Sequence, residues 1–150
     1  MEYIEYGTLI TFLENSDYTT TKTGLSDTFS DRLDMFLGAA DGLLHLHKNG
    51  MIHCDMKPAN VLVDASSGVP IAKICDFGGS YKLPDGIEEA CPSNRGGTHG
   101  YISPEQISGK FGPSTDIYAL GIILIETNSG KYFAQSRSDG AANVPYYYKY

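Results

Sequence analysis

The stretch HCDMKPAN, residues 53–60, decides how the chain is interpreted, together with the tripeptide DFG at residues 76–78. The first stretch places a carboxylate at Asp55, an ammonium group at Lys57 and an amide at Asn60, and the second opens with another carboxylate. Carboxylate and amide oxygens suit Mg²⁺, and a lysine beside them can hold an anion. An Asp near a Lys is by itself more often a solvated surface pair, so a binding or catalytic role for Asp55 and Lys57 needs support from the rest of the chain.

Upstream of this stretch, residues 30–48 are predicted to form a helix. Apolar side chains recur there at helical spacing and form one stripe. The members of the stripe are Leu33, Phe36, Leu37, Ala40, Leu44 and His47. Ser30 is the predicted N-cap, and Asn49-Gly50 is predicted to end the helix with a left-handed residue. The polar residues 14–30 before it are predicted to be a short helix that gives way to a surface loop.

Downstream, two strands are predicted at residues 61–63 and 71–75, with a turn between them. Regular structure is not expected at Lys57-Pro58, because proline lacks a backbone donor. Residues 79–100 are rich in Gly, Ser, Pro and Asp and are predicted to be a long loop, which in a compact domain is usually functional. A second apolar helix is predicted for about residues 114–128.

The composition restricts the class of protein. Hydrophobic residues make up 41% and charged residues 19% of the 150 residues, as in an ordinary globular domain. The net charge of −7 argues against a nucleic-acid partner. The longest apolar run, residues 117–125, is too short for a membrane span. The spacing of Cys54, Cys75 and Cys91 is neither paired nor zinc-like, which predicts a reducing, cytoplasmic location.

The order of the motifs resembles that of the eukaryotic-type protein kinases, whose signatures include H-R-D-x-x-x-x-N and D-F-G. Three further segments support the resemblance. Gly97-Thr98-x-x-Tyr101-x-x-Pro104-Glu105 is similar to the end of an activation segment. Asp116–Gly121 is similar to the helix that supports the catalytic loop, and MEYIEY at residues 1–6 is similar to the hinge between kinase lobes. Cys54 stands where the family usually has Arg, so the pocket for an activation-loop phosphate lacks its central charge.

The resemblance implies an α+β fold that is a mostly helical, kinase-like C-terminal lobe with short antiparallel strands and without the N-lobe sheet. Residues 1–150 then form a partial kinase domain, truncated at both ends, without the glycine-rich loop and the strand lysine of the upper lobe. Its expected parts are a hinge at residues 1–9, the catalytic loop at 53–60, the activation segment at 76–105 and the supporting helix at about 114–128.

The resemblance also implies roles for individual residues. Asp55, Lys57 and Thr98 are the expected catalytic residues, with Thr98 bridging the other two. Lys57 also contacts the transferring phosphate, and Asn60 and Asp76 hold Mg²⁺ and through it ATP. On the adenine side, the backbone of Glu2 and Ile4 and the side chain of Leu62 complete the nucleotide site. His53 is expected to be structural, hydrogen-bonded to backbone and packed near Phe77, and Cys75 to be a small buried hydrophobe.

The expected function is that of a protein serine/threonine kinase, incomplete as given, which transfers the γ-phosphate of ATP to Ser or Thr hydroxyls of a protein substrate. Lys57-Pro58 and the spacing that ends in Pro104-Glu105 resemble Ser/Thr kinases more than tyrosine kinases. Aminoglycoside and choline phosphotransferases share the H-x-D-x-x-x-x-N element but not the segment ending in Pro-Glu. The alternative is a catalytically inactive, kinase-like fragment or scaffold that binds partner proteins.

Overall fold

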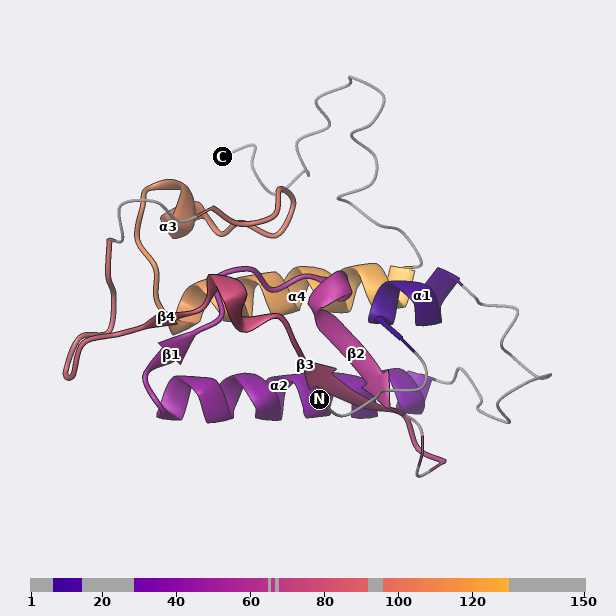
Figure 1. The fold of residues 1–150 in the computed structure, drawn as a ribbon. Coiled ribbons are helices and arrows are strands. Elements are labelled where there is room, and N and C mark those ends of the chain that lie inside the picture. The colour runs from indigo at the N-terminus through magenta and orange to yellow at the C-terminus, as the bar shows by residue number, and fades with distance from the viewer. Residues whose placement is uncertain (1–6, 15–28, 65, 67, 92–95, 130–150) are drawn as a thin grey trace, which may run out of the picture.

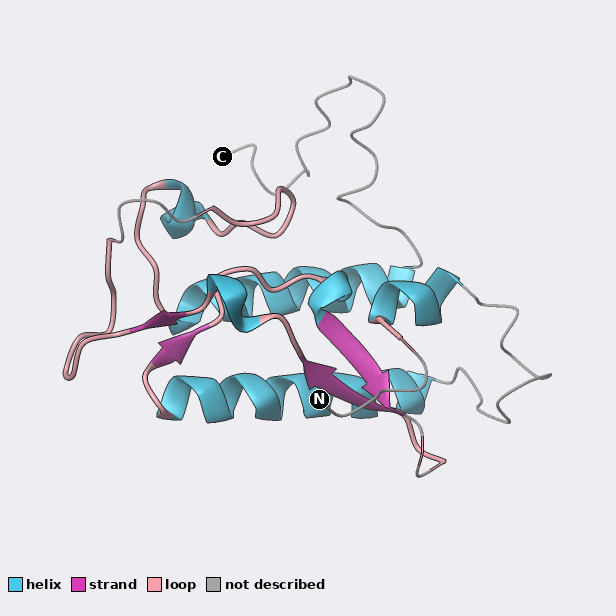
Figure 2. Ribbon diagram, in the orientation of Figure 1, coloured by secondary structure: helices cyan, strands magenta, loops and turns pink. Residues whose placement is uncertain are grey.

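The computed structural model describes residues 7–14, 29–64, 66, 68–91 and 96–129. Helices predominate in this part of the chain, and the strands are short (Figure 2). In chain order, the elements are α1 (Leu9–Glu14), α2 (Phe29–Lys48), β1 (Met51–Ile52), the 3₁₀ helix η2 (Pro58–Asn60), β2 (Val61–Asp64), β3 (Ile71–Ile74), the 3₁₀ helix η3 (Phe77–Gly79), β4 (Tyr81–Lys82), α3 (Pro104–Ile107) and α4 (Pro113–Ser129).

The two long helices α2 and α4 lie side by side and run in opposite directions, and the β2–β3 hairpin packs against α2 (Figure 1). Strands β2 and β3 are antiparallel, with Val61 opposite Ile74. This confirms the predicted strand pair. Strand β1 pairs antiparallel with β4, Ile52 opposite Tyr81. Strand β1 ends just before the 53–60 segment and β2 begins just after it, so each end of that segment adjoins a strand.

The buried face of α2 differs from the predicted stripe. Of the stripe, Phe36 is buried, whereas Leu33, Leu37 and Leu44 are exposed. The buried residues of the helix are Met35, Phe36, Ala39 and Leu43. The prediction was wrong because α2 carries apolar side chains on more than one side, so their spacing does not identify the face that meets β3 and α4.

Other boundaries also differ from the prediction. Helix α2 begins at Phe29, so Ser30 lies inside the helix and does not cap it. A 3₁₀ turn starts directly at Pro58, where no regular structure was expected, because proline is tolerated at the first position of a helix. The predicted loop at 79–100 contains β4. Gly50 has φ 65°, which confirms the left-handed end of the helix. No helix in the described ranges is long and apolar enough to cross a bilayer.

Gly38 lies where α2 meets β3, and its replacement should separate the two elements. A Cβ there would lie 3.0 Å from the carbonyl oxygen of Ala72 and 3.2 Å from its nitrogen, whereas a Cβ at Gly121 of α4 would meet no atom within 4 Å. We expect Gly38→Ala to lower the free energy of unfolding by about 1–3 kcal/mol, because backbone cannot move aside cheaply. Gly121→Ala should raise it by about 0.5–1 kcal/mol through helix propensity. Urea titrations followed by circular dichroism test both, and a Gly38→Ala protein as stable as the original would contradict the close contact.

Candidate functional site

The 53–60 segment is anchored by Asp116, which lies in the first turn of α4 and is 1% exposed. Its Oδ1 accepts a hydrogen bond from the Cys54 N–H at 2.9 Å, and its Oδ2 accepts one from the His53 N–H at 2.8 Å. Nε2 of His47 also lies 2.9 Å from Oδ2. A buried carboxylate is tolerated where such contacts replace its hydration. Helix α4 therefore fixes the backbone at the start of the segment.

Cys54 adopts a left-handed backbone conformation with φ 69°, which residues other than glycine rarely adopt. This conformation costs about 1–3 kcal/mol and persists only where the surroundings impose it. The N–H of Cys54 is held by Asp116, and its carbonyl oxygen accepts from Nε2 of Gln106 at 3.2 Å. The backbone of Cys54 is thus held from both sides, directly before Asp55.

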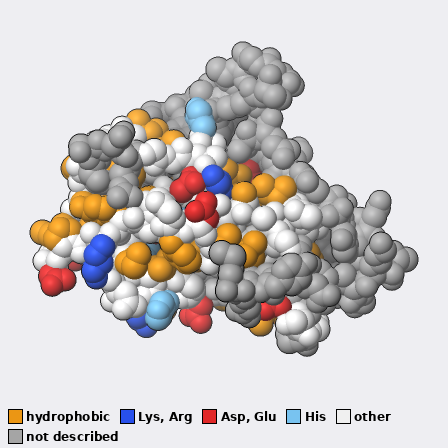
Figure 3. Space-filling view, in the orientation of Figure 1, with side chains coloured by type: hydrophobic (Ala, Val, Ile, Leu, Met, Phe, Trp, Pro, Cys, Tyr) orange, Lys and Arg blue, Asp and Glu red, His pale blue; other side chains and the backbone are white. Residues whose placement is uncertain are grey.

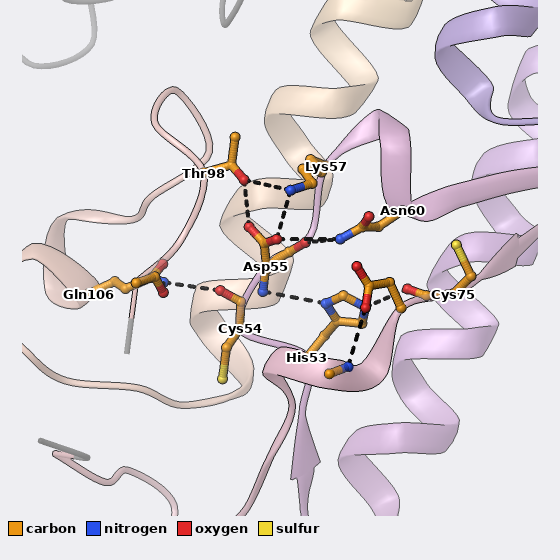
Figure 4. A network of polar contacts seen from close by, with 11 residues as sticks. His53, Cys54, Asp55, Lys57, Asn60, Cys75, Thr98 and Gln106 are labelled. Carbon is orange, nitrogen blue, oxygen red and sulfur yellow. Dashed lines mark hydrogen bonds and ion pairs between the residues drawn. The ribbon is translucent and has the colours of Figure 1, made fainter. Parts of the chain in front are cut away.

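Asp55, Lys57 and Thr98 form a closed set of polar contacts (Figure 4). Nζ of Lys57 donates to Oδ2 of Asp55 at 2.8 Å and to Oγ1 of Thr98 at 2.9 Å. The Thr98 hydroxyl donates to Oδ1 of Asp55 at 2.7 Å. The expected bridge from Thr98 to the other two residues is therefore present, across 43 residues of sequence.

The pKa of Asp55 reflects competing influences. Partial burial raises it, but the hydrogen bonds from Lys57 and Thr98 and the positive charge of Lys57 lower it by more, so the pKa of Asp55 lies below its ordinary value. Asp55 is therefore an ionised hydrogen-bond acceptor at neutral pH and a weak base. Oδ2 of Asp55 accepts from Lys57 at 2.8 Å and, at 3.5 Å, from Nδ2 of Asn60, whereas Oδ1 accepts from the Thr98 hydroxyl. A carboxylate oxygen has two lone pairs, so Oδ1 can accept a further hydrogen bond.

Asn60 and Asp76 supply hard oxygen atoms beside this set. Nδ2 of Asn60 donates to the carbonyl oxygen of Asp55 at 2.8 Å, so Oδ1 of Asn60 points away from that carbonyl group. No described residue donates a hydrogen bond to Oδ1 of Asn60. Asp76 has φ 60° and accepts from the Gly78 N–H at 3.4 Å. The N–H of Cys75, next to Asp76, donates to the carbonyl oxygen of Asn60 at 3.0 Å, so the turns that carry Asn60 and Asp76 are joined.

This donor set fits Mg²⁺. Within the described ranges, no group of three or more His, Cys, Asp or Glu side chains gathers as a metal cage. Mg²⁺ is instead usually bound by one or two protein oxygens and completes its octahedron with water and phosphate oxygens. The oxygens of Asn60 and Asp76 match that pattern.

His53 has the structural contacts that the sequence predicts. Its Nδ1 accepts from the Asp55 N–H at 3.4 Å, so Nε2 carries the proton and donates to the carbonyl oxygen of Cys75 at 2.9 Å. Its ring meets that of Phe77 edge to face, with centroids 5.6 Å apart. Cys75 itself is half-buried rather than fully buried, and burial together with the charge of Asp76 raises the pKa of its thiol. That thiol is therefore a poor nucleophile at neutral pH.

A cavity of about 380 Å³ opens over Asp55. Backbone rather than bulky side chains forms much of its wall, since four glycines line it. The lining residues are Cys54, Asp55, Gly78, Gly79, Gly96, Gly97 and Thr98. On the face shown in Figure 3, acidic and basic atoms meet near the centre, between apolar areas. Asp55 is the charged residue among those that line this cavity.

The expected adenine side lies partly outside the described residues, which do not include Glu2 and Ile4. In the described part, the carbonyl oxygen of Gly7 accepts from the Val63 N–H at 3.0 Å, and Thr8 forms a bridge with Leu62. Leu62 is half-buried on the face of β2 opposite to the core residues of that strand. The chain just after the predicted hinge thus runs along β2, next to Leu62.

Several contacts of the site were not predicted. His47 was predicted only as a member of the apolar stripe, yet it reaches Asp116. The hydroxyl of Tyr101 donates to Oε2 of Glu126 at 2.7 Å, a buried contact between the chain before α3 and α4. Glu126 shares the buried helical face of Asp116 and is 1% exposed, and a carboxylate on an apolar face is a signal that could have suggested a partner. Nothing in the sequence indicated the role of Gln106.

Removing the charge beside Asp55 should raise its pKa. Because the pKa of Asp55 is lowered in the folded protein, its ionisation stabilises the fold above the unfolded pKa, and this stabilisation is lost as the pH falls through the folded pKa. In Lys57→Met, the hydrogen bond and the charge of Lys57 are lost, while burial continues to raise the pKa and the Thr98 hydrogen bond continues to lower it. We therefore expect the carbon-13 signal of the Asp55 carboxyl to titrate at higher pH, and the stability that Asp55 contributes in acid to shrink.

The matched control for this titration is Lys73→Met. Lys73 pairs with Asp64 at 2.8 Å on the β2–β3 hairpin, and its hydrogen bond is the main cause that lowers the pKa of Asp64 to about 2. The control should raise the pKa of Asp64 and leave that of Asp55 unchanged. Equal titration of Asp55 in the original protein and in Lys57→Met would mean that Lys57 is not its partner in solution.

Comparison with known proteins agrees with this geometry. A family model described as "Protein kinase domain" matches residues 1–145. The "Probable serine/threonine-protein kinase PBL28" of Arabidopsis thaliana is 40% identical over 106 residues, which are 67% of this chain and 28% of that protein. The "G-type lectin S-receptor-like serine/threonine-protein kinase LECRK2" of Oryza sativa subsp. indica is 36% identical over 129 residues, which are 83% of this chain and 14% of that protein.

The chain spans between 14% and 28% of the length of these two relatives. The family match extends over nearly all of the chain and includes the 53–60 segment, the DFG turn and α4. The chain therefore belongs to the protein kinase family.

Proposed function

We propose that residues 1–150 form the C-terminal lobe of a protein serine/threonine kinase, which transfers the γ-phosphate of ATP to Ser or Thr hydroxyls of protein substrates. The observation that carries this proposal is the closed set of contacts among Asp55, Lys57 and Thr98 at the edge of an open, glycine-lined cavity. The names of the relatives, which are serine/threonine-protein kinases, support the choice of hydroxyl.

In this proposal, Asp55 positions the acceptor hydroxyl. Its lowered pKa keeps it ionised, so it accepts a hydrogen bond from the hydroxyl and orients the oxygen for attack, and it takes the proton only as the new bond forms. Thr98 and Lys57 hold one carboxylate oxygen each, which restricts the rotation of the Asp55 side chain. Holding a reacting group in this way is a large part of enzymatic rate enhancement.

Lys57 has a second role at the phosphate. An ammonium group has three protons, and two of them are donated to Asp55 and Thr98. The third remains for an oxygen of the transferring group. Oδ1 of Asn60 and the carboxylate of Asp76 would hold Mg²⁺, and the adenine would lie near Leu62 and the backbone of Glu2 and Ile4. When bound, Mg-ATP supplies the phosphoryl group and the cation that neutralises its oxygens.

The proposal divides the chain into functional parts. Residues 1–9 are the hinge to an upper lobe, residues 53–60 the catalytic loop, residues 76–105 the activation segment and residues 114–128, approximately, the supporting helix. The contacts of Asp116 with the catalytic loop support the last assignment.

The test compares the 150 residues alone with the same residues joined at the hinge to the upper lobe of an Arabidopsis relative, referred to below as the joined protein. The 150 residues contain no G-x-G-x-x-G loop, so on their own they cover the phosphates from one side. Water then weakens the electrostatic positioning. We expect residues 1–150 to bind Mg-ATP weakly and to transfer no measurable labelled phosphate to a generic Ser/Thr substrate. The joined protein should transfer it.

The other outcomes are equally informative. An inactive joined protein that still binds Mg-ATP would favour the alternative, a kinase-like scaffold that binds partner proteins. Efficient transfer by residues 1–150 alone would show that the lower lobe is a sufficient catalyst.

A further inference from the structure

Gln106 lies where three parts of the chain meet: the start of α3, the catalytic loop and the glycine pair before Thr98. Its Nε2 lies 3.2 Å from the carbonyl oxygen of Cys54 (Figure 4). The same nitrogen lies 3.3 Å from the carbonyl oxygen of Gly96, and Oε1 of Gln106 lies 3.4 Å from the Ser103 nitrogen. A side-chain amide has two donor hydrogens. Both hydrogens and the oxygen are therefore engaged, and this arrangement fixes the orientation of the amide, which is largely buried.

The two carbonyl groups belong to neighbours of two site residues. Cys54 directly precedes Asp55, and Gly96 lies two residues before Thr98. The side chains of Asp55 and Thr98 are in turn hydrogen-bonded at 2.7 Å. Gln106 thus ties together the backbones that carry these side chains, without a hydrogen bond to either. It also holds the carbonyl side of the left-handed residue Cys54, whose N–H side is held by Asp116.

The residue at position 97 provides independent support. A Cβ on Gly97 would lie 2.7 Å from Nε2 of Gln106, closer than real Cβ atoms approach a neighbour, and at a tight 3.1 Å from Cγ1 of Ile102. A Cβ on Gly96 would meet no atom within 4 Å. Of the two adjacent glycines, only the second is required by the close approach of the amide. The local backbone is therefore fitted to Gln106.

We propose that Gln106 is a positioning residue, an uncharged latch that holds the end of the activation segment against the catalytic loop. It thereby maintains the hydrogen bond from Thr98 to Asp55. The proposal deepens the proposed function and rests on it, because it assumes that Asp55 and Thr98 serve phosphoryl transfer. The latch joins neutral groups, and the neighbouring Cys54 carries no charge. Moderate salt, which screens exposed ion pairs, should therefore leave the link in place.

The decisive variant is Gln106→Glu in residues 1–150. Glutamate can still accept from the Ser103 N–H, as in a Ser-x-x-Glu capping box, so the cap of α3 remains. At neutral pH it cannot donate to the two carbonyl groups. We expect two changes. The Tyr101 amide, which donates to the Thr98 carbonyl at 3.0 Å, should exchange its hydrogen about tenfold faster. The methyl group of Thr98 should have a lower NMR order parameter, because the hydrogen bond from Thr98 to Asp55 is loosened.

Two glycine variants provide a second, independent test. Gly97→Ala should displace the amide and reproduce both changes while Gln106 itself is intact. Gly96→Ala is the matched control, and both measurements should give the same values in it as in the original protein. If Gln106→Glu fails to fold by circular dichroism, the glycine pair decides the question by the same two measurements.

An unchanged exchange rate of the Tyr101 amide and an unchanged order parameter of the Thr98 methyl group in Gln106→Glu or in Gly97→Ala would overturn the latch, and so would equal changes in Gly96→Ala. Neither measurement needs enzymatic activity, so a negative result for the latch and a negative result for the kinase proposal are distinguishable. In the joined protein, Gln106→Glu should raise KM for the acceptor peptide and leave KM for ATP unchanged, whereas a general loss of folding would reduce the active fraction without this split.

Discussion

Asp55→Asn should lower phosphoryl transfer by the joined protein by about 10²- to 10⁴-fold, the range typical of an acid–base group. The amide that replaces the carboxylate has no negative charge, so Lys57 loses its ion pair at 2.8 Å. The nitrogen of the new amide cannot accept the hydrogen bond that the replaced carboxylate oxygen accepted. The acceptor hydroxyl then loses the group that orients it. Asn60 and Asp76 are unchanged, so we expect the dissociation constant of Mg-ATP, measured by calorimetry, to stay within about twofold, well under 1.4 kcal/mol.

The control is Asp64→Asn. Asp64 also pairs with a lysine at 2.8 Å, but on the β2–β3 hairpin. A surface ion pair of this kind contributes little to stability, and its loss should leave transfer unaffected. Comparable rates for the two variants would exclude Asp55 as the positioning carboxylate. Loss of nucleotide binding in Asp55→Asn would indicate that the substitution disturbs the Mg²⁺ ligands.

Asp116→Ala should have the largest effect on stability. It leaves the buried N–H groups of His53 and Cys54 without an acceptor, and His47 without its partner. Each unsatisfied buried group costs about 1–3 kcal/mol, so we expect a loss of about 3–5 kcal/mol in the free energy of unfolding. That is a large share of the about 5–15 kcal/mol of a typical domain. Urea denaturation of residues 1–150 measures it.

Two further variants make this test specific. Asp116→Asn keeps one acceptor oxygen and the shape of the side chain, so its free energy of unfolding should lie between that of the original protein and that of Asp116→Ala. Asp41→Ala removes an exposed carboxylate of α2 and should change stability by less than about 0.5 kcal/mol. An Asp116→Ala protein within about 1 kcal/mol of the original would show that water can replace the buried carboxylate.

The long elements were predictable because each has a local signal. Residues 30–48 and 114–128 have enough length for the helical period to emerge, and 61–63 and 71–75 are apolar runs separated by a turn. The pairing of β1 with β4 has no such signal. Each of these strands has two residues, which is too few for an alternating pattern, and the Ile52–Tyr81 pair joins distant parts of the chain. Such strands are determined by tertiary contacts.

The side chains of the site were predicted through motif spacing, whereas the contacts that support them were not. Asp55, Lys57 and Thr98 stand at family-like positions, and their mutual contacts were expected. The amide contacts of Gln106 depend on the close approach of two carbonyl groups across 52 and 10 residues of sequence. The spacing of one chain carries no information on such approach. The same holds for His47, whose partner lies 69 residues away.

The anchoring of the 53–60 segment by Asp116 has a consequence for biosynthesis. The carboxylate that holds the His53 N–H is encoded 63 residues later. Ribosomes add about 5–20 residues per second, so the segment leaves the peptidyl-transferase centre about 3–13 s before its anchor exists. During that interval, the left-handed turn at Cys54 has nothing to impose it. A nascent chain released after residue 60 but before residue 116 therefore carries every residue of the HCDMKPAN stretch but lacks the carboxylate that orders it, and termination in this interval yields no partially assembled site.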